Sequence, residues 1–293
     1  MTERPLHVLF CGIDGVRWDV LQQTPTPALD RVVRRGFLAP VQVNAAAPTI
    51  SGPSWASLFT GVLATSHNIY NNKFQGHRLG DYPDFIARVL HAWPERQWFA
   101  GAAWEPLVSE HSGGPLLARG GVLPARRGTP AVDQSHWFED DQEIADKAVA
   151  AISDFDSEVG SVSFVYQHAV DMTGHKIGVN EHYVAALTAS DRRLGEVLDA
   201  VEARPSFARE DWLIVVATDH GHVDGGGHGG DDPHERTAWI AACGPGVPTG
   251  GMLLLEQADV AGHILHTLGI TPNSPDFVGV PFGTRAGLVA ASS

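Results

Sequence analysis

The segment Trp212-Leu-Ile-Val-Val-Ala-Thr-Asp-His-Gly-His222 shows most clearly which kind of fold the chain adopts. Residues 212–218 form its most apolar strand-like run and predict a buried strand, and Asp219 and His220 follow directly. Open α/β sheets place their chemistry just beyond the carboxyl ends of the strands, where an unpaired buried carboxylate is costly. The segment therefore predicts a strand of an α/β sheet that ends at a metal or cation site.

The same alternation of apolar strands and amphipathic helices continues along the chain. Strands are predicted at 7–13, 38–44, 98–103, 161–166 and 237–243. Helices are predicted at 17–23, 27–35, 54–60, 84–91, 141–154, 181–201 and 257–268. This order predicts a doubly wound, mostly parallel sheet with helices on both faces.

The domain organisation follows from the absence of a linker between two folding units. We expect a single domain over residues 1–293. Residues 104–141 are rich in Gly, Pro and Arg and lack clear periodicity, so we expect a loop or small cap that determines substrate specificity.

Composition limits the classes of partner. The 293 residues carry a net charge of −14, with 43% hydrophobic and 18% charged residues, which is ordinary for a globular protein. The negative charge argues against nucleic acid or an anionic membrane as a partner, although divalent cations would still attract phosphate locally. There is no signal-peptide pattern and no run long enough to cross a bilayer, so we expect a cytoplasmic protein. Cys11 and Cys243 lie in apolar runs and are predicted to be buried free thiols.

Further polar residues follow the other predicted strands. Asp14 comes after the first strand, and Asp171 and His175 come after the strand at 161–166. An Asp and a His four residues apart converge on one ion if the chain folds back or continues as a helix. His168, which lies nearby, is expected to be a structural histidine.

A glycine-rich loop after His220 contains more histidines than packing explains. Ligation is the better explanation, and we favour His228, which is flanked by glycines, as the ligand. His222 and His234 are the alternatives.

A hydroxyl group precedes the predicted helix at 54–60. Ser51 lies just before Pro53, a residue suited to the first turn of a helix, so its hydroxyl would lie at the positive end of the helix dipole. Asn72 could donate its amide to a phosphate oxygen, and Lys73 could add positive charge. Two clusters of carboxylates and imidazoles beside a hydroxyl nucleophile are what metal-assisted phosphoryl transfer requires.

These motifs, in this order, resemble the alkaline phosphatase superfamily, and most of all its nucleotide pyrophosphatase/phosphodiesterase branch. The matching stretches run from Ile13 to Thr237 and read GIDGVRWDVL, TPALDRV, APTISGPSWASLFTG, SHNIYNN, DMTGHKIG, TDHGH, GGHGG and ERT. The resemblance implies two zinc ions, with manganese as the alternative metal. It implies that one ion is bound by Asp171, His175 and His228, and the other by Asp14, Asp219, His220 and the nucleophile.

The resemblance also identifies the nucleophile. The diesterases of the family carry a threonine nine residues before the threonine of a Thr-Gly pair, and here that count from Thr60 falls on Ser51, with Thr49 as the second choice. Serine at this position departs from the diesterases and is similar to the alkaline phosphatases proper. In the same register Asn72 matches the phosphate-binding asparagine of the family.

We therefore expect a two-metal phosphoesterase that hydrolyses phosphodiester or pyrophosphate bonds through a covalent phosphoserine. The substrate would be a small phosphate ester or nucleotide. The alternatives are a phosphomonoesterase, a manganese-dependent phosphomutase and a non-catalytic binding relative. The sequence does not determine the oligomeric state.

Overall fold

A computed structural model describes residues 4–110, 113–125, 136–251 and 253–285 of the chain. Within these residues one sheet of six strands has the order β2-β6-β5-β1-β4-β3. The strands are β1 (Leu6–Ile13), β2 (Gly36–Gln42), β3 (Gln97–Gly101), β4 (Ser161–Gln167), β5 (Asp211–Ala217) and β6 (Thr237–Cys243). Strand β1 runs parallel to β4 and β5, β3 runs parallel to β4, and β6 is antiparallel to both β5 and β2. The predicted mostly parallel α/β sheet is confirmed.

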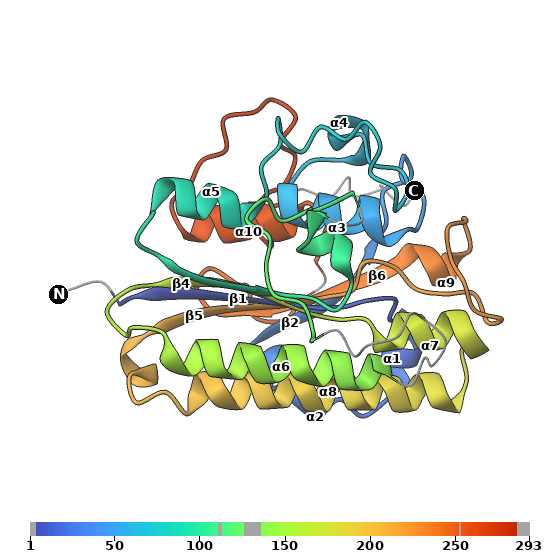
Figure 1. Cartoon of the computed structure of the whole chain (residues 1–293), viewed down its shortest axis with the longest axis horizontal. Helices are drawn as coiled ribbons and strands as arrows, with labels where there is room; N and C mark the ends of the chain where they lie inside the picture. The colour runs from blue at the N-terminus through green and yellow to red at the C-terminus, as the bar shows by residue number, and fades with distance from the viewer. Residues whose placement is uncertain (1–3, 111–112, 126–135, 252, 286–293) are drawn as a thin grey trace, which may run out of the picture.

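Both faces of the sheet are covered by helices, as Figure 1 shows. Side chains alternate along β1, so that Val8 and Phe10 belong to one apolar core and Leu9 and Cys11 to the other. Helices α3 (Ser51–Thr60), α5 (Phe85–Ala92) and α10 (Asp259–Thr267) lie over the first face. Helices α2 (Pro27–Val33), α6 (Trp137–Asp154) and α8 (Glu181–Glu202) lie over the second. Two buried cores explain why β1 is apolar at consecutive positions.

Several element boundaries differ from the prediction. Helix α3 begins at Ser51 rather than residue 54, because Pro53 lies within the first turn, where its missing N–H is not needed. Helix α6 begins at Trp137, so the end of the expected loop at 104–141 is helical. The rest of that region contains the short helix η1 (Glu105–Leu107) and a bridge from Val122 to Gly101. Residues 111–112 and 126–135 lie outside the described residues.

Shorter helices lie mainly at the carboxyl end of the sheet. These are α1 (Trp18–Gln23), α4 (Ala64–His67), α7 (Ala169–Ile177) and α9 (Pro233–Arg236). Cys11 and Cys243 are buried free thiols, as predicted. Among the described residues, no helix combines the length and apolar character needed to cross a bilayer. The cytoplasmic location stays a prediction.

Candidate metal centre

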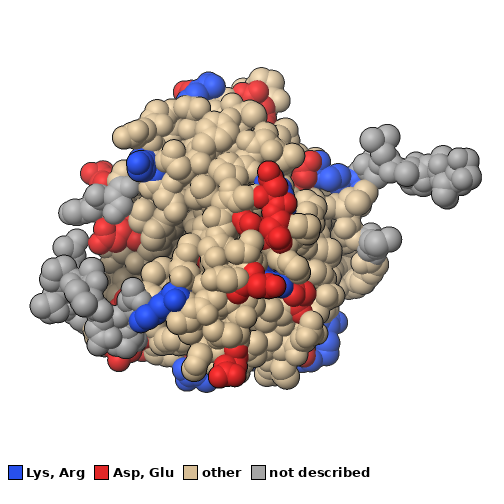
Figure 2. Space-filling model, turned by 90° about the vertical axis from the view of Figure 1, so that its right-hand side faces the viewer, with Lys and Arg blue, Asp and Glu red and all other residues tan. Residues whose placement is uncertain are grey.

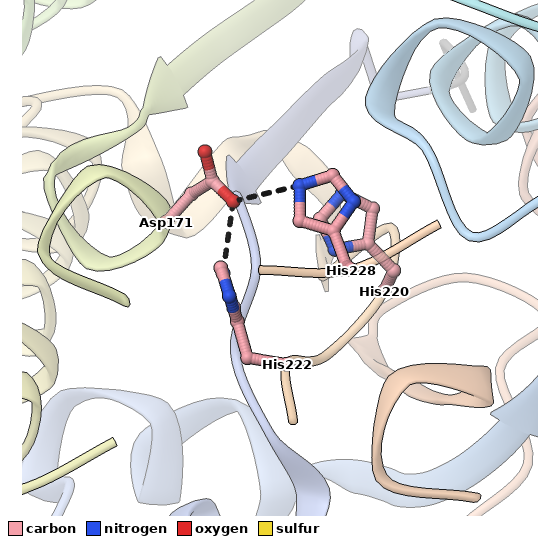
Figure 3. Close-up of side chains that lie close together, drawn as sticks. All are labelled: Asp171, His220, His222 and His228. Carbon is pink, nitrogen blue, oxygen red and sulfur yellow. Dashed lines mark hydrogen bonds and ion pairs between the residues drawn. The ribbon is translucent and has the colours of Figure 1, made fainter. Parts of the chain in front are cut away.

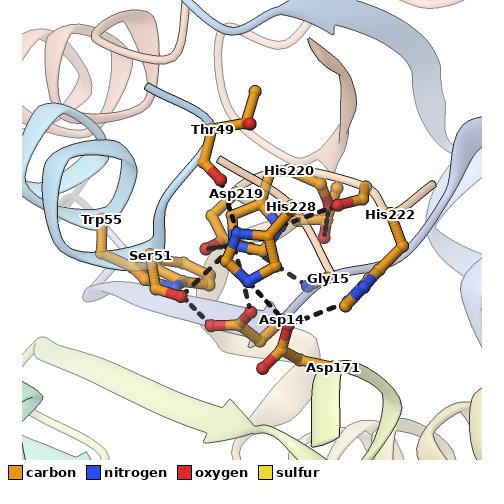
Figure 4. A network of polar contacts seen from close by, with 12 residues as sticks. Asp14, Gly15, Thr49, Ser51, Trp55, Asp171, Asp219, His220, His222 and His228 are labelled. Atoms are coloured by element: carbon orange, nitrogen blue, oxygen red, sulfur yellow. Dashed lines mark hydrogen bonds and ion pairs between the residues drawn. The ribbon is translucent and has the colours of Figure 1, made fainter. Parts of the chain in front are cut away.

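Three parallel strands end at one edge of the sheet and bring the polar motifs together there. Asp14 follows β1, Asp219 lies two residues beyond β5, and α7 begins two residues beyond β4. The amide of Asp14 donates to the carbonyl of Gln167 at 2.9 Å, which joins the ends of β1 and β4. Residues more than 200 positions apart in the chain therefore share one site (Figure 4).

Asp14, Asp219 and His220 form the first group that could hold a metal ion. One ligand atom of each lies within 4.8 Å of the others. Asp14 Oδ2 accepts hydrogen bonds from Trp55 Nε1 at 2.9 Å and from the Tyr166 hydroxyl at 2.6 Å. These bonds hold the carboxylate so that its other oxygen remains available.

The remaining oxygens of the two carboxylates lack donors. Asp219 Oδ1 accepts the Gly15 amide at 3.1 Å. Asp14 Oδ1 and Asp219 Oδ2 are buried and accept no hydrogen bond from any described residue. A buried carboxylate oxygen without a donor is costly, so these two atoms indicate a cation as the missing partner.

His220 supports the same conclusion through the position of its proton. Its Nδ1 lies 3.1 Å from the carbonyl oxygen of Gly221, which can only accept, so Nδ1 carries the proton and Nε2 presents a lone pair. This Nε2 lies 3.1 Å from Asp219 Oδ2 and 3.7 Å from Asp14 Oδ1. Three electron-rich atoms that face one another repel unless a cation lies between them. The donors therefore fit a divalent cation.

Burial and mutual repulsion dominate the titration of the first group. Burial, together with the nearby carboxylate of Asp171, raises the pKa of Asp14 to about 7. Burial and the charge of Asp14 raise the pKa of Asp219 well above its usual range. Burial likewise places the pKa of His220 well below its ordinary value. A bound cation would favour the ionised form of both carboxylates and so lower their pKa values.

Asp171, His175 and His228 form a second convergence beside the first. Asp171 and His175 lie one helical turn apart on α7, with His175 Nε2 3.5 Å from Asp171 Oδ2. His228 Nε2 lies 2.9 Å from His175 Nε2 and 3.4 Å from Asp171 Oδ1. Its Nδ1 donates to the carbonyl of Thr49 at 2.6 Å, so Nε2 again presents a lone pair. The His220 and His228 rings stack at 3.8 Å, which places the two groups side by side.

His222 also contacts this second group (Figure 3). One ligand atom each from Asp171, His220, His222 and His228 lies within 4.8 Å of the others. However, the Gly227 amide donates to His222 Nδ1 at 3.1 Å, so the ring proton lies on Nε2, which donates to Asp171 Oδ1 at 2.9 Å. A nitrogen that carries a proton cannot bind a metal. His222 is therefore a donor to Asp171, whereas His228 presents an unprotonated Nε2 beside the Nε2 of His175.

Asp171 differs from the other two carboxylates in its titration. Burial opposes its ionisation, but the hydrogen bond from His222 and the other imidazoles nearby outweigh burial and hold its pKa well below the usual range. The third histidine that the sequence offers, His234, has a half-exposed side chain that pairs with Asp232 at 3.1 Å. It belongs to neither metal-binding group among the described residues.

The two hydroxyl candidates differ in their surroundings. Ser51 is the first residue of α3, and its Oγ lies 3.3 Å from His220 Nε2. Thr49 is fully buried, and its Oγ1 donates to Glu235 Oε2 at 2.9 Å and accepts from the Gly229 amide at 2.8 Å. Ser51 is therefore the hydroxyl beside the metal-binding group, and Thr49 anchors the loop that carries His228.

A cavity of about 350 Å³ opens at this position. It is lined by Ile50, Ser51, Asn72, Trp104, Tyr166, His168, Asp171, Met172, His175 and His228. Asn72 Oδ1 accepts the Gly52 amide at 2.8 Å, so the Nδ2 group is the part of this side chain that can donate to a ligand. Lys73 is exposed and is not among the lining residues, so the structure does not bring it to the cavity.

The surface around the site is acidic. Figure 2 faces the end of the molecule where the parallel strands terminate, and it shows acidic side chains gathered near the centre with basic ones beside them. Among the loops at this end, Asp224 and Asp231 are strongly exposed and pair with Arg17 and Arg236. An anionic substrate would therefore depend on bound cations at the site rather than on the surface charge around it.

Some residues of the site are not recognisable from sequence. Trp55 and Tyr166 read as core aromatics of a helix and a strand, yet their polar atoms hold Asp14. Glu235 reads as a surface residue but is buried beneath Thr49. In the sequence, the one sign of these roles is that Trp55, Tyr166 and Glu235 carry polar side-chain atoms close to the buried motifs.

The family model for type I phosphodiesterase / nucleotide pyrophosphatase matches residues 8–243. The chain belongs to this family. A relative within it, ectonucleotide pyrophosphatase/phosphodiesterase family member 7 of Mus musculus, is 22% identical over 230 residues, which are 75% of this chain and 51% of the relative. The chain thus spans about half the length of that relative.

Solved structures confirm the fold. A 2-O GAG sulfatase superposes with a TM-score of 0.70 at 16% identity, covering 95% of this chain and 73% of that one. Inactive murine ectonucleotide pyrophosphatase/phosphodiesterase 5 in complex with AMP superposes with a TM-score of 0.64 at 15% identity, covering 91% of this chain and 96% of that one. These proteins share the alkaline-phosphatase-like architecture with the phosphodiesterase family to which the chain belongs.

Proposed function

We propose that the protein is a two-metal phosphoesterase that cleaves phosphodiester or pyrophosphate bonds, with Ser51 as the nucleophile. The observation that carries the proposal is the position of Ser51 Oγ, 3.3 Å from the unprotonated Nε2 of His220. The same Nε2 faces Asp14 Oδ1 and Asp219 Oδ2, the two carboxylate oxygens that lack donors among the described residues. A divalent cation bound by Asp14, Asp219 and His220 would lower the pKa of the Ser51 hydroxyl, and a second one bound by Asp171, His175 and His228 would withdraw charge from the phosphoryl oxygens. Mixed carboxylate and imidazole donors favour zinc, with manganese as the alternative.

The reaction then follows from the residues of the cavity. Ser51 Oγ gives its proton to solvent and bonds to phosphorus, while the bond from phosphorus to the leaving oxygen breaks and that oxygen departs with the electron pair. Asn72 Nδ2 donates to a non-bridging oxygen, and the Gly52 bond keeps this donor oriented during attack. Water next attacks phosphorus, the Oγ–P bond breaks, and Ser51 regains its proton as phosphate or a phosphate ester leaves. The product of the first step is a covalent phosphoserine.

The lining of the cavity favours substrates with one charge on the reacting phosphate. Among the described residues that line it there is no Lys or Arg. A phosphomonoester carries an additional negative charge, which would require an additional positive group. This observation supports a phosphodiester or pyrophosphate bond over a monoester as the proposed target, and we propose a small nucleotide-like molecule as the substrate.

Variants of α3 test the nucleophile. Ser51→Ala should abolish hydrolysis of bis-p-nitrophenyl phosphate while elemental analysis still finds about two divalent ions per chain. Ser54→Ala is the matched control, because Ser54 is buried on the same helix and its Oγ makes no hydrogen bond to any described residue. Full activity in Ser51→Ala, or activity in protein stripped of metal, would refute the proposal. Comparison with p-nitrophenyl phosphate separates diesterase from monoesterase activity.

A further inference from the structure

An aspartate–histidine pair lies at the wall of the cavity and belongs to neither metal-binding group. Asp141 on α6 is fully buried, and its Oδ1 lies 3.1 Å from His168 Nδ1. The same carboxylate accepts the backbone amides of His168 and Ala169, each at 3.0 Å. Because Asp141 receives three donors, it is held as a carboxylate acceptor, and His168 carries a proton on Nδ1.

The other nitrogen of His168 has no partner among the residues that the structure describes. Its Nε2 makes no hydrogen bond to any described residue, and the imidazole, 11% exposed, lines the same cavity as Ser51 and Asn72. His67, for comparison, has both ring nitrogens hydrogen-bonded, through the Ile69 amide and the Ser57 hydroxyl. His168 has one nitrogen held by Asp141, and its other nitrogen is available to a molecule in the cavity.

His168 is also the one remaining cationic candidate among the described lining residues. His175 and His228 belong to the second metal-binding group, and the lining contains no Lys or Arg. Burial opposes the charged form of His168, but Asp141 outweighs burial and raises the pKa of the imidazole. The other titratable groups near the ring are Asp14, Asp171, Tyr166 and, beyond Asp141, Arg193.

We propose that His168 is a substrate-binding residue whose Nε2 donates a hydrogen bond to the second phosphate of a pyrophosphate-linked substrate. One phosphate occupies the position next to Ser51 and Asn72, and the adjoining phosphate meets the imidazole held by Asp141. A charge-assisted bond of this kind is roughly twice as strong as a neutral one. The cavity would then select pyrophosphate bonds over simple phosphodiesters. This inference rests on the proposed phosphoesterase function.

Two substitutions separate binding from structure at this position. In His168→Asn the amide nitrogen lies near the place of Nδ1, so the bond to Asp141 is kept and the donor into the cavity is lost. In His168→Gln the amide nitrogen lies near the place of Nε2, so a donor into the cavity is kept. His91→Gln is the control, because His91 is exposed on α5 and outside the cavity.

The catalytic arm compares an adenosine substrate with one phosphate, the p-nitrophenyl ester of AMP, and one with two phosphates, diadenosine diphosphate. His168→Asn should lower kcat/KM for diadenosine diphosphate by roughly tenfold or more, mainly through KM, because a hydrogen bond to a charged group is lost. The p-nitrophenyl ester should change by less than about threefold, since it lacks the second phosphate. His168→Gln should recover most of the loss. Equal losses for both substrates, or no loss, would overturn the inference.

A binding experiment tests the role of His168 without depending on catalysis. Calorimetric titration of metal-replete Ser51→Ala protein with ADP and AMP should show that His168→Asn weakens ADP binding by roughly tenfold and AMP binding much less. If the chain binds ADP in this way but hydrolyses neither substrate, the proposed function fails and the role of His168 stands. If it hydrolyses both substrates and ADP binding is unchanged, the proposed function stands and the role of His168 fails.

Discussion

His222 Nε2 lies 2.9 Å from Asp171 Oδ1, and the opposite nitrogen of the same ring accepts the Gly227 amide. The backbone of the glycine-rich loop thereby sets the proton of His222 toward Asp171. A donor to a ligating carboxylate fixes its orientation without binding the metal. Gly174 is required for this contact, because a Cβ there would lie 2.8 Å from the His222 ring.

This relationship predicts the metal affinity of His222 variants. His222→Leu should weaken binding at the second group by about 10- to 100-fold, the usual effect of losing such a support. His222→Gln keeps a donor near the place of Nε2 and should retain most of the affinity. Competition with a chromophoric chelator measures both. Unchanged affinity in His222→Leu would show that the hydrogen bond does not orient Asp171.

Glu235 joins the loop of the nucleophile to the loop of His228. Its Oε2 alone accepts both the Thr49 hydroxyl at 2.9 Å and the Gly230 amide at 2.7 Å. Glu235→Leu removes the acceptor of the buried Thr49 hydroxyl and of the Gly230 amide, and should cost about 1–3 kcal/mol of unfolding free energy. It should also lower activity, since Thr49 holds His228. Glu235→Gln can keep both bonds through one oxygen, so denaturant unfolding should show a loss of less than about 1 kcal/mol. Similar losses in the two variants would contradict this assignment.

Asp219 should stabilise the metal-bound protein and destabilise the metal-free one. Its raised pKa means that ionisation costs stability in the metal-free fold, a cost that grows as the pH rises above the unfolded-state pKa. In Asp219→Asn the amide can donate to His220 Nε2, which lies 3.1 Å from Oδ2 in the native protein. At mildly alkaline pH we expect metal-free Asp219→Asn to be more stable than the metal-free parent by roughly 2 kcal/mol.

The same variant should reverse its order of stability once metal is added. The parent protein gains stability from every ion it binds, whereas Asp219→Asn binds the first ion more weakly and gains less. Calorimetric melting with and without chelator measures both states. A lower melting temperature for Asp219→Asn in both states would rule out the electrostatic penalty that we assign to the metal-free site.

The buried imidazole of His7, which belongs to neither metal-binding group, should make the protein less stable in mild acid. Its ring stacks on Trp212 with centroids 4.5 Å apart, and burial lowers its pKa from 6.5 to about 4. A histidine with a lowered pKa contributes full stability above pH 6.5 and loses it as the pH falls toward 4, because the unfolded chain takes up the proton first. This shift corresponds to about 3 kcal/mol at most.

The variant His7→Phe keeps a ring on Trp212 but cannot titrate. Its unfolding free energy should therefore fall less steeply between pH 6.5 and 4 than that of the parent. The pKa of the neighbouring Glu210 is lowered to about 2 despite burial, by bonds from Arg204, so its contribution is lost only in stronger acid. Denaturant unfolding across this range checks the slope. Parallel pH profiles for parent and variant would exclude His7 as the source.

Much of the architecture could be anticipated from local patterns. The apolar runs at 7–13, 161–166 and 212–218 became β1, β4 and β5, because a strand buried on both faces needs apolar residues at consecutive positions. The boundaries were less accurate at α3 and α6. Helix α3 begins with small or polar residues such as Ser51, ahead of its apolar stripe. Helix α6 begins with Trp137 and Phe138, and acidic residues separate these two from the rest of its apolar stripe.

The candidate site was also partly visible in the chain. Asp14, Asp171 and Asp219 follow apolar strands, and parallel strands bring such residues to one edge of a sheet. The roles of His168 and Glu235 were not recognisable, since they depend on contacts with Asp141 and Thr49 that only the folded chain brings about.

The order of apolar and polar residues was therefore enough to predict the sheet, the edge that carries the chemistry and the residue types gathered there. Only the tertiary structure decides which histidine nitrogens hold protons. His220 and His228 donate from Nδ1 to backbone carbonyls, and His222 accepts a backbone amide at the same atom. Chemically identical side chains thus divide into candidate ligands and a supporting donor, because each ring takes its tautomer from the one backbone group that folding places beside it.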